Sequence, residues 1–275
     1  MQMTSVMPEG RRVEDTLPAS THDFYRRMIL AVRDSNIDFL IGGTYAIEQW
    51  AGFARPTKDL DLFVRPEHAR AMLDVLAHNG CRVELTYPHW LGKAFRGDAF
   101  IDVIFNAGNG IAKVDDLWFE HASNCKAFGL DVKLCPAEET LWSKSWVMER
   151  ERYDGADVAH ILRARADELD WPRLLDRFGN DWRILLSHLV LFGFVYPCER
   201  HRVPAWVMDH LMARLAHEHH SQPEAGRVCQ GTLVSREQYL IDIDRWDYGD
   251  ARLGERHTMT PEEIAHWTAA IQLNQ

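Results

Sequence analysis

The stretch IGGTYA at residues 41–46, followed by RPTKDLDLF at residues 55–63, decides the fold. The apolar run at 37–41 predicts a buried strand, because it is short and is closed by a pair of glycines that marks a tight turn. A helix is expected over 44–50, and a second strand over 60–64. The sequence therefore predicts a strand, a glycine turn, a helix and a second strand in one short segment.

Three aspartates form the candidate catalytic and metal-binding set. Asp59 and Asp61 flank Leu60 on the second strand, and side chains alternate between faces along a strand, so both carboxylates lie on one face. Asp102 lies within the apolar stretch FIDVIF, where a charged side chain is costly unless it is paired or ligates a cation. Clustered carboxylates repel each other, and their oxygens suit Mg²⁺ or Mn²⁺. We therefore expect Asp59, Asp61 and Asp102 to bind one of these ions.

The glycine pair supplies the phosphate side of the expected site. Gly42 and Gly43 let the backbone approach a phosphate closely, and the following helix offers N–H groups and the positive end of its dipole. Thr44 is the expected N-cap of that helix. Paired metal ions support in-line phosphoryl transfer, one accompanying a nucleoside triphosphate and the other activating an acceptor hydroxyl, with Asp102 as a candidate general base.

The rest of the first half of the chain alternates between predicted helices and strands. Apolar spacing predicts helices over 22–35 and 66–79, the second one ended by Gly80. The step Gly97-Asp98 is a hairpin signal between two strands. The strands expected in this half after residue 80 are 81–87, 93–96, 100–105 and 130–134.

The second half reads as helical. Pro136 opens a helix that is expected to run through Val147, with Glu138 and Glu139 in its first turn. A second helical piece is expected over 156–166. Helical periodicity continues over 171–215, a loop is expected over 221–235, and a capping box at Thr260 starts a terminal helix to about residue 272.

Composition sets limits on the class of protein. The chain has 275 residues and a net charge of −10, which does not favour steering to nucleic acid by the global field. Five cysteines with no close pair indicate free thiols in a reducing cytoplasm. No segment has the roughly 18–20 uninterrupted apolar residues needed to span a bilayer. Residues 1–20 are polar and aperiodic and are expected to be a flexible leader.

These motifs together resemble the polymerase-β-like nucleotidyltransferase superfamily. The form R-x-T-x-D-L-D is most similar to the bacterial branch of abortive-infection toxin and minimal nucleotidyltransferases, over roughly residues 25–165. The resemblance implies an α+β fold with a mixed sheet flanked by helices, then an all-helical C-terminal region. The expected domains are a leader over 1–20, a nucleotidyltransferase domain over 21–168 and a helical domain over 169–275.

The resemblance also implies roles for single residues. Asp59 and Asp61 would ligate metal, and Asp102 would be the third carboxylate. The nucleotide would contact the glycine turn, Lys58 and, on a later helix, Lys144. The later residues that match the toxin branch are the arginine at 150 or 152, Asp154 and Asp157, with Tyr153 in place of the usual lysine. Position 43 is Gly where many members have Ser, so Thr44 is a candidate source of the hydroxyl.

Other polar clusters have simpler interpretations. The histidines His217, His219 and His220 are typical of a solvated helix end, with a metal site as the weaker alternative. Asp242, Asp244 and Asp247 imitate a second acidic motif, but no glycine turn precedes them at suitable spacing. Lys144 as a solvated side chain remains an equal alternative to phosphate contact. Surface ion pairs are the simpler interpretation of Arg150 and Arg152.

The function that follows is metal-dependent transfer of a nucleoside monophosphate from a triphosphate to a hydroxyl. RNA, a protein side chain and a small molecule all stay open as the acceptor. The alternative is a catalytically silent module on the same fold, acting as a nucleotide sensor or as a toxin–antitoxin partner. The expected partners include the nucleoside triphosphate and no membrane, and a homodimer is left open.

Overall fold

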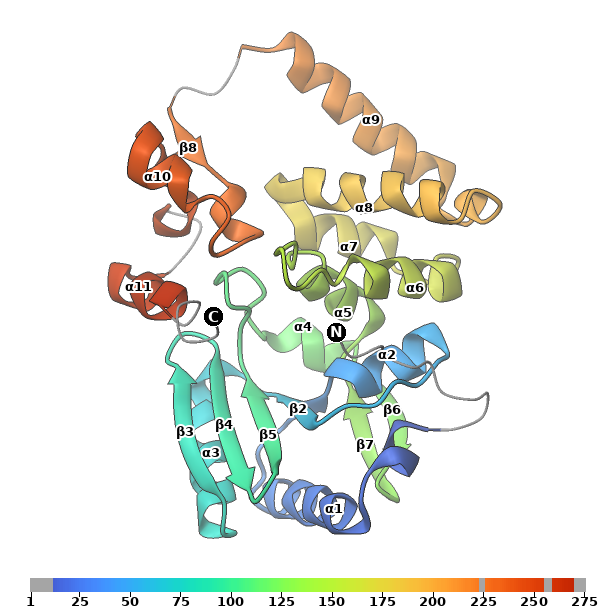
Figure 1. Ribbon diagram of the computed structural model, residues 1–275. Helices are drawn as coiled ribbons and strands as arrows, with labels where there is room; N and C mark the ends of the chain where they lie inside the picture. The colour runs from blue at the N-terminus through green and yellow to red at the C-terminus, as the bar shows by residue number, and fades with distance from the viewer. Residues whose placement is uncertain (1–11, 223–225, 255–258, 270–275) are drawn as a thin grey trace. The chain divides into compact units, whose positions relative to one another are not determined.

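A computed structural model describes residues 12–222, 226–254 and 259–269 (Figure 1). The chain forms two compact units, the first of Met1–Pro136 with Ala265–Trp267 and the second of Ala137–Ile264 with Thr268–Gln275. This boundary falls earlier than the domain boundary expected at residue 168. The extent of the nucleotidyltransferase domain therefore stays a prediction, with its last helices placed in the second unit.

The first unit is built on a mixed seven-stranded sheet with the order β3-β4-β5-β2-β1-β7-β6. β1 pairs antiparallel with β2 and parallel with β7, and β2 pairs parallel with β5. The sheet thus brings together strands far apart in sequence. The strand bounds are β1 Leu40–Ile41, β2 Asp59–Phe63, β3 Arg82–Tyr87, β4 Leu91–Arg96, β5 Ala99–Ile104, β6 Ser123–Ala127 and β7 Leu130–Leu134.

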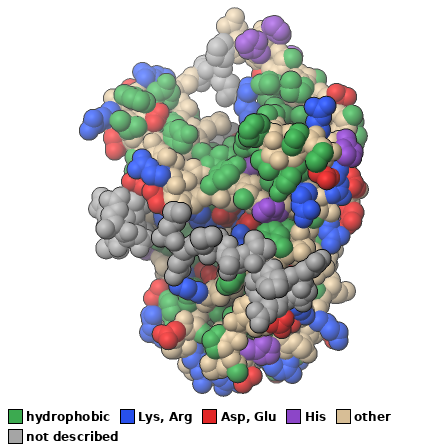
Figure 2. Space-filling view, turned by 45° about the vertical axis from the view of Figure 1, so that its right-hand side comes forward, with side chains coloured by type: hydrophobic (Ala, Val, Ile, Leu, Met, Phe, Trp, Pro, Cys, Tyr) green, Lys and Arg blue, Asp and Glu red, His purple; other side chains and the backbone are tan. Residues whose placement is uncertain are grey.

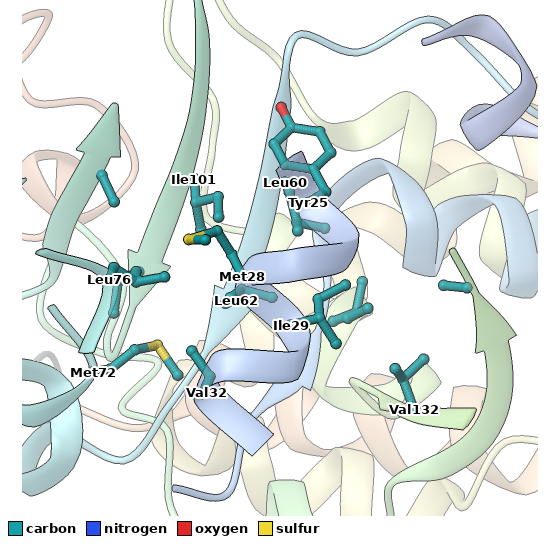
Figure 3. Packing of buried hydrophobic residues seen from close by; sticks show 14 of the residues in the cluster. Tyr25, Met28, Ile29, Val32, Leu60, Leu62, Met72, Leu76, Ile101 and Val132 are labelled. Carbon is teal, nitrogen blue, oxygen red and sulfur yellow. The ribbon is translucent and has the colours of Figure 1, made fainter. Parts of the chain in front are cut away.

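Helices complete the first unit, and α1 and α3 cover one face of its sheet. Figure 3 shows Leu60, Leu62 and Ile101 packed with Met28 of α1 and Leu76 of α3, and all five side chains are buried. Since side chains alternate along a strand, the residues between these apolar positions face the other side of the sheet. The helices are α1 Ala19–Asp34, α2 Gly43–Ala51, α3 Ala69–His78 after the 3-10 turn Pro66–His68, and α4 Asp116–Glu120.

Residues 13–20, which were expected to belong to a flexible leader, are folded. Residues 1–11 lie outside the described residues. From there on, Val13–Thr16 forms a 3-10 helix, Val13 is fully buried, and the Glu14 carboxylate accepts a hydrogen bond from the Phe128 N–H at 2.5 Å. The interpretation of residues 13–20 as a leader is therefore wrong, because a single apolar side chain and one carboxylate fasten this segment to the unit.

The helix α4 and the strand β6 of the first unit were also not expected from the sequence. β6 pairs with β7 through a two-residue turn, in which Phe128 has a φ of 54° and Gly129 a φ of 67°. A bulky residue is rare in the left-handed region. Here the Phe128 ring is fully buried, and Arg26 donates to its carbonyl at 2.6 Å. Contacts distant in sequence thus fix a turn that the local sequence does not indicate.

The second unit is mainly helical, which confirms the predicted α+β class with a helical C-terminal region. Two short parallel strands, β8 Val228–Cys229 and β9 Gly249–Asp250, interrupt the helices within the expected loop and beyond it. The capping box at Thr260 is confirmed by reciprocal hydrogen bonds with Glu263. The helices are α5 Ala137–Lys144, α6 Gly155–Arg165, α7 Trp171–Phe178, α8 Trp182–Val195, α9 Ala205–His220, α10 Leu240–Trp246 and α11 Pro261–Ala269.

The first helix of this unit, α5, ends at Lys144 and not at Val147 as predicted. Past its end, the Ser145 carbonyl accepts a hydrogen bond from His188, and the Met148 N–H donates to the Val234 carbonyl at 3.0 Å. These partners lie outside the helix, so the backbone groups leave the helical pattern. The end of α5 is therefore set by packing against later segments.

Apolar side chains are also exposed on the second unit. Figure 2 shows hydrophobic side chains gathered at the molecular surface, and Phe194 at the end of α8 is 82% exposed. Within the described residues, no helix combines the length and the apolar character that crossing a membrane requires.

Candidate functional site

The strand pairing brings the three predicted aspartates together. Asp59 and Asp61 lie on β2, and Asp102 lies on the neighbouring strand β5, directly opposite Asp61 in the parallel register. All three are half-buried, and one carboxylate oxygen from each lies within 4.8 Å of the others. The prediction that these residues form one cluster is thereby supported by geometry, on the sheet face opposite the apolar core.

The glycine turn lies against the same cluster. The Gly42 N–H donates to the Asp61 carbonyl at 3.0 Å, so the turn continues the row of strands next to Asp61. Gly43 has a φ of 55°, and a Cβ atom built on it would overlap the Asp61 carboxylate. A Cβ atom on Gly42 would overlap the Phe63 ring. Only glycines allow the backbone to pass this close to the strand that carries the acids.

Thr44 is not the N-cap of the following helix. α2 begins at Gly43, with Gly42 in the cap position and no side-chain capping hydrogen bond. The prediction of Thr44 as N-cap was wrong because the turn lacks room for side chains at its tightest point, so the helix starts inside the glycine pair. The expected contacts of Gly42, Gly43 and Thr44 with nucleotide stay predictions.

Neighbouring hydroxyl groups support the acidic cluster. The Thr57 hydroxyl donates to the Asp59 carboxylate, which gives the threonine of the R-x-T-x-D motif a positioning role. The Tyr25 hydroxyl lies between the Lys58 and Phe100 carbonyls at 3.2 and 3.1 Å, and ties α1 to both strands. Burial and then the nearby aspartates raise the pKa of Tyr25 well above its usual value, so it stays a neutral donor.

Lys93 is the residue of this site that the sequence interpretation missed. It lies on β4 directly opposite Asp102, and its ammonium group contacts both carboxylate oxygens at 2.7 and 3.0 Å. The predicted Gly97-Asp98 hairpin held the signal that could have revealed it. A two-residue turn pairs Arg96 with Ala99, and counting back from there places Lys93 opposite Asp102.

The donor set fits a small divalent cation. Three carboxylates offer hard oxygen ligands, which Mg²⁺ and Mn²⁺ prefer over nitrogen or sulfur. Their oxygens lie close enough together to share one ion. Within the described residues, no other group of three histidine, cysteine or acidic side chains meets this geometry, including the histidines at the end of α9 and the aspartates of α10.

Lys144 lies in a separate cluster in the second unit. Its ammonium group contacts Asp154 at 3.1 Å and Asp157 at 2.7 Å, and all three side chains are largely buried. Arg152 also pairs with Asp154, and its side chain is largely exposed, as the surface ion-pair interpretation expected. Tyr153, the departure from the toxin pattern, is half exposed and stacks on His188. The solvated interpretation of Lys144 is therefore wrong.

The charges in this second cluster stabilise the ionised carboxylate. Burial alone would raise the pKa of Asp154, but the charges of Lys144 and Arg152 and the hydrogen bonds from both outweigh it and lower that pKa below its usual value. The expected contact of Lys144 with nucleotide stays a prediction. Lys58, the other expected lysine, is exposed next to Asp59.

The family assignment agrees with this geometry. Residues 42–187 match the model of a family described as "Uncharacterised nucleotidyltransferase", a span that includes the glycine turn, the three aspartates and Lys144. The protein is therefore a nucleotidyltransferase by class. Because the match covers more than half of the 275 residues, the chain belongs to this family of uncharacterised nucleotidyltransferases. No curated protein matches the chain.

Several solved structures resemble the chain at low identity. The solution structure of the antibiotic-resistance factor ANT(2'')-Ia is 18% identical, with a TM-score of 0.37, covering 74% of this chain and 100% of its own. Lincomycin-bound LnuA, a lincosamide antibiotic adenylyltransferase, is 11% identical, with a TM-score of 0.39 and coverages of 52% and 97%. JHP933 from Helicobacter pylori is 10% identical, with a TM-score of 0.38 and coverages of 74% and 97%. Scores this low carry no argument about the substrate.

Proposed function

We propose that the protein transfers a nucleoside monophosphate from a nucleoside triphosphate to a hydroxyl acceptor, and that Mg²⁺ or Mn²⁺ bound by its three aspartates is required. One observation carries the proposal. The oxygens of Asp59, Asp61 and Asp102 lie within 4.8 Å of one another, and the glycine turn passes directly over Asp61. A cation site and a phosphate-binding turn thus share one residue.

Each part of the site has a role in this reaction. The acceptor oxygen forms a bond to the α-phosphorus, the bond to the pyrophosphate oxygen breaks, and the hydroxyl proton is released. Gly43 and Thr44 hold the triphosphate through backbone N–H groups at the start of α2, and Gly42, whose own N–H donates to the Asp61 carbonyl, lets the backbone come close to it. A divalent cation supplies charge neutralisation to the phosphate oxygens. The three aspartates hold and orient that charge, and Thr57 fixes the direction of the Asp59 carboxylate.

Lys58 and Lys144 are the lysines expected to contact the nucleotide. Lys58 is exposed beside Asp59, where a flexible ammonium group can reach a phosphate. Lys144 contributes as well only if it exchanges a carboxylate partner for a phosphate oxygen, since both of its partners lie within 3.1 Å. The acceptor class is left among RNA, a protein side chain and a small molecule, and the net charge of −10 is against bulk RNA binding.

The test is transfer of label from α-labelled nucleoside triphosphates, with and without Mg²⁺, to pools of RNA, protein and small hydroxyl compounds. We expect transfer that requires Mg²⁺ and falls by on the order of 10³-fold in Asp61→Asn, because the site loses one of its cation ligands. Asp131→Asn is the matched control, since Asp131 is an exposed aspartate of β7 in the same sheet. Equal transfer by Asp61→Asn would contradict the site assignment.

The silent alternative gives a different result in the same experiment. A nucleotide sensor would bind labelled triphosphate in equilibrium dialysis but transfer no label to any acceptor pool. Membership of the abortive-infection toxin branch, and a homodimer, also stay predictions. Growth arrest on expression and the molecular mass in solution would test them.

A further inference from the structure

Lys93 places a fixed positive charge inside the acidic cluster. Its side chain is 22% exposed and that of Asp102 is 13% exposed, so water screens the pair only partly. The ammonium group contacts both oxygens of Asp102, and it also lies 4.7 Å from the centre of the Phe100 ring. Lys93 is thus held from two sides at the third carboxylate.

The register of three strands explains why this charge matters for the site. Lys93 of β4, Asp102 of β5 and Asp61 of β2 are direct neighbours in adjacent strands, so they form a row across one face of the sheet. Asp59 lies two residues from Asp61 on the same face. The row places the strand of Lys93, β4, on the side of β5 away from β2, which carries Asp59 and Asp61.

The other two aspartates are held by different groups. Asp59 accepts a hydrogen bond from the Thr57 hydroxyl, which is neutral. Asp61 lies under the Gly43 backbone, where the glycine leaves room for its carboxylate. Lys93 pairs with Asp102, with 2.7 Å between its ammonium nitrogen and one carboxylate oxygen. Its charge therefore acts mainly on one of the three ligands.

We infer that Lys93 takes the place of a second cation at Asp102, and thereby limits the nucleotide-free site to one divalent cation, held by Asp59 and Asp61. This inference rests on the metal site of the proposed function. A second ion, arriving with the triphosphate, gains Asp102 only by displacing Lys93. The lysine is then a positioning residue that determines how many cations the empty enzyme binds.

A structural role alone makes a different prediction. Cross-strand pairs of opposite charge contribute about 0.2–1 kcal/mol to sheet stability and carry no consequence for metal binding. The number of bound cations and their affinity, measured without nucleotide, therefore distinguish the two roles. Neither readout depends on turnover.

The experiment titrates the full chain with Mn²⁺ alone and measures free Mn²⁺ by electron paramagnetic resonance. The wild type should bind one Mn²⁺ per chain, and Asp61→Asn should lose that ion. Lys93→Met removes the charge and should either bind a second Mn²⁺ or bind the first about tenfold more tightly, the effect expected from deleting one unit charge near a divalent ion in a high-dielectric surrounding. Lys93→Arg keeps the charge and should match the wild type.

Two further variants serve as a control and as an alternative neutral substitution. Lys133→Met is the matched control, because Lys133 is an exposed lysine of β7 in the same sheet, and it should leave the titration unchanged. Lys93→Gln removes the charge but keeps a hydrogen-bond donor for Asp102, and serves where Lys93→Met does not fold.

The outcomes separate this inference from the proposed function. If the wild type binds Mn²⁺ through Asp61 but neither neutral variant changes stoichiometry or affinity, the inference is overturned and the metal site stands. Two ions in the wild type, both lost in Asp61→Asn, would overturn it as well. If the wild type binds no Mn²⁺ at all, the metal site itself is wrong, and both fail together.

Discussion

The acidic groups of the two units are partnered in opposite ways. In the first unit, three half-buried carboxylates lie close enough together to share one ion, and Lys93 pairs with Asp102. In the second unit, Asp154 and Asp157 are nearly buried and share Lys144, with Arg152 adding a further positive charge. The acidic cluster of Asp59, Asp61 and Asp102 can accept a cation. The cluster of Lys144, Arg152, Asp154 and Asp157, here called the balanced cluster, pairs its carboxylates with its own cations and stabilises the fold. Charge balance and burial, rather than residue type, separate the two.

The largest effect is expected from breaking the balanced cluster. Lys144→Met should lower the free energy of unfolding by about 3–5 kcal/mol, because it leaves buried carboxylates without their shared cation. Urea denaturation at pH 7 measures it. Lys133→Met, which removes an exposed lysine from the other unit, should change stability by less than about 0.5 kcal/mol. Similar losses in the two variants would remove the distinction between the clusters.

A substitution in the glycine turn tests the acidic cluster, because the Gly43 backbone lies against the Asp61 carboxylate. Gly43→Ala should cut label transfer by about 100-fold, because the new Cβ atom forces the Asp61 carboxylate to move, and even a small misplacement of a reacting group is that costly. Gly52→Ala is a matched control: Gly52 also has a positive φ, 77°, but nothing lies within 4 Å of its added Cβ.

The two glycine variants differ in whether the added Cβ atom meets the Asp61 carboxylate. Both should lose about 1–2 kcal/mol of stability from backbone strain in the left-handed region. Only Gly43→Ala should also lose transfer. Equal activity in both variants, measured under conditions where both are folded, would show that the turn does not shape the acidic site.

The contribution of Asp154 to the free energy of unfolding should depend on pH, which tests the ion pairs of the balanced cluster. Asp154→Asn should cost about 1.5–3 kcal/mol at pH 7, the usual contribution of hydrogen bonds to charged groups. Because the pKa of Asp154 is lowered in the fold, its stabilisation is complete above the unfolded pKa of about 3.9, and is lost as the pH falls through the lower folded value.

Urea denaturation at several pH values measures this effect. The deficit of Asp154→Asn should be constant between pH 7 and pH 5 and should shrink below about pH 4. A deficit that already declines between pH 7 and pH 5 would mean that the carboxylate is not held in its ionised form by Lys144.

The smallest effect concerns His188, a neutral neighbour of the balanced cluster. Burial lowers the pKa of His188, partly offset by its hydrogen bond to the Ser145 carbonyl, so the ring is neutral in the fold. The unfolded chain binds a proton near pH 6.5 and the fold does not. The stability of the wild type relative to His188→Gln should therefore fall by up to about 1.4 kcal/mol per pH unit below pH 6.5. If the stability difference between the wild type and His188→Gln does not change with pH, the His188 ring binds a proton in the folded protein as it does in the unfolded chain.

The sequence predicted those parts of the site that local patterns encode. Alternation along one strand places Asp59 and Asp61 on the same face, and an aspartate amid apolar residues marks Asp102. Lys93 was missed because its role depends on pairing between strands, although the hairpin turn at Gly97 carried the register. Thr44 was assigned the wrong role because local cap preferences ignore the crowding of Gly43 by Asp61.

The sequence likewise predicted those parts of the fold that local patterns encode. Strands and helices with strong apolar spacing were found, including the strand at 130–134. β6 was missed because its turn depends on Phe128, whose left-handed backbone is held by Arg26 and Glu14 from the start of the chain. Such contacts cannot be inferred from propensity, since they exist only after distant segments have met.

The row of strands across the acidic cluster has a consequence for folding. Gly42, Asp61, Lys93 and Asp102 come from four strands or strand ends, and the parallel pairing of β2 with β5 closes a long loop of chain. The whole set exists only in a sheet in which β4, β5, β2 and β1 have all paired. A ligand that binds this set therefore binds the chain only after these four strands have met, and at 100 times its dissociation constant it would add about 2.7 kcal/mol to the free energy of unfolding.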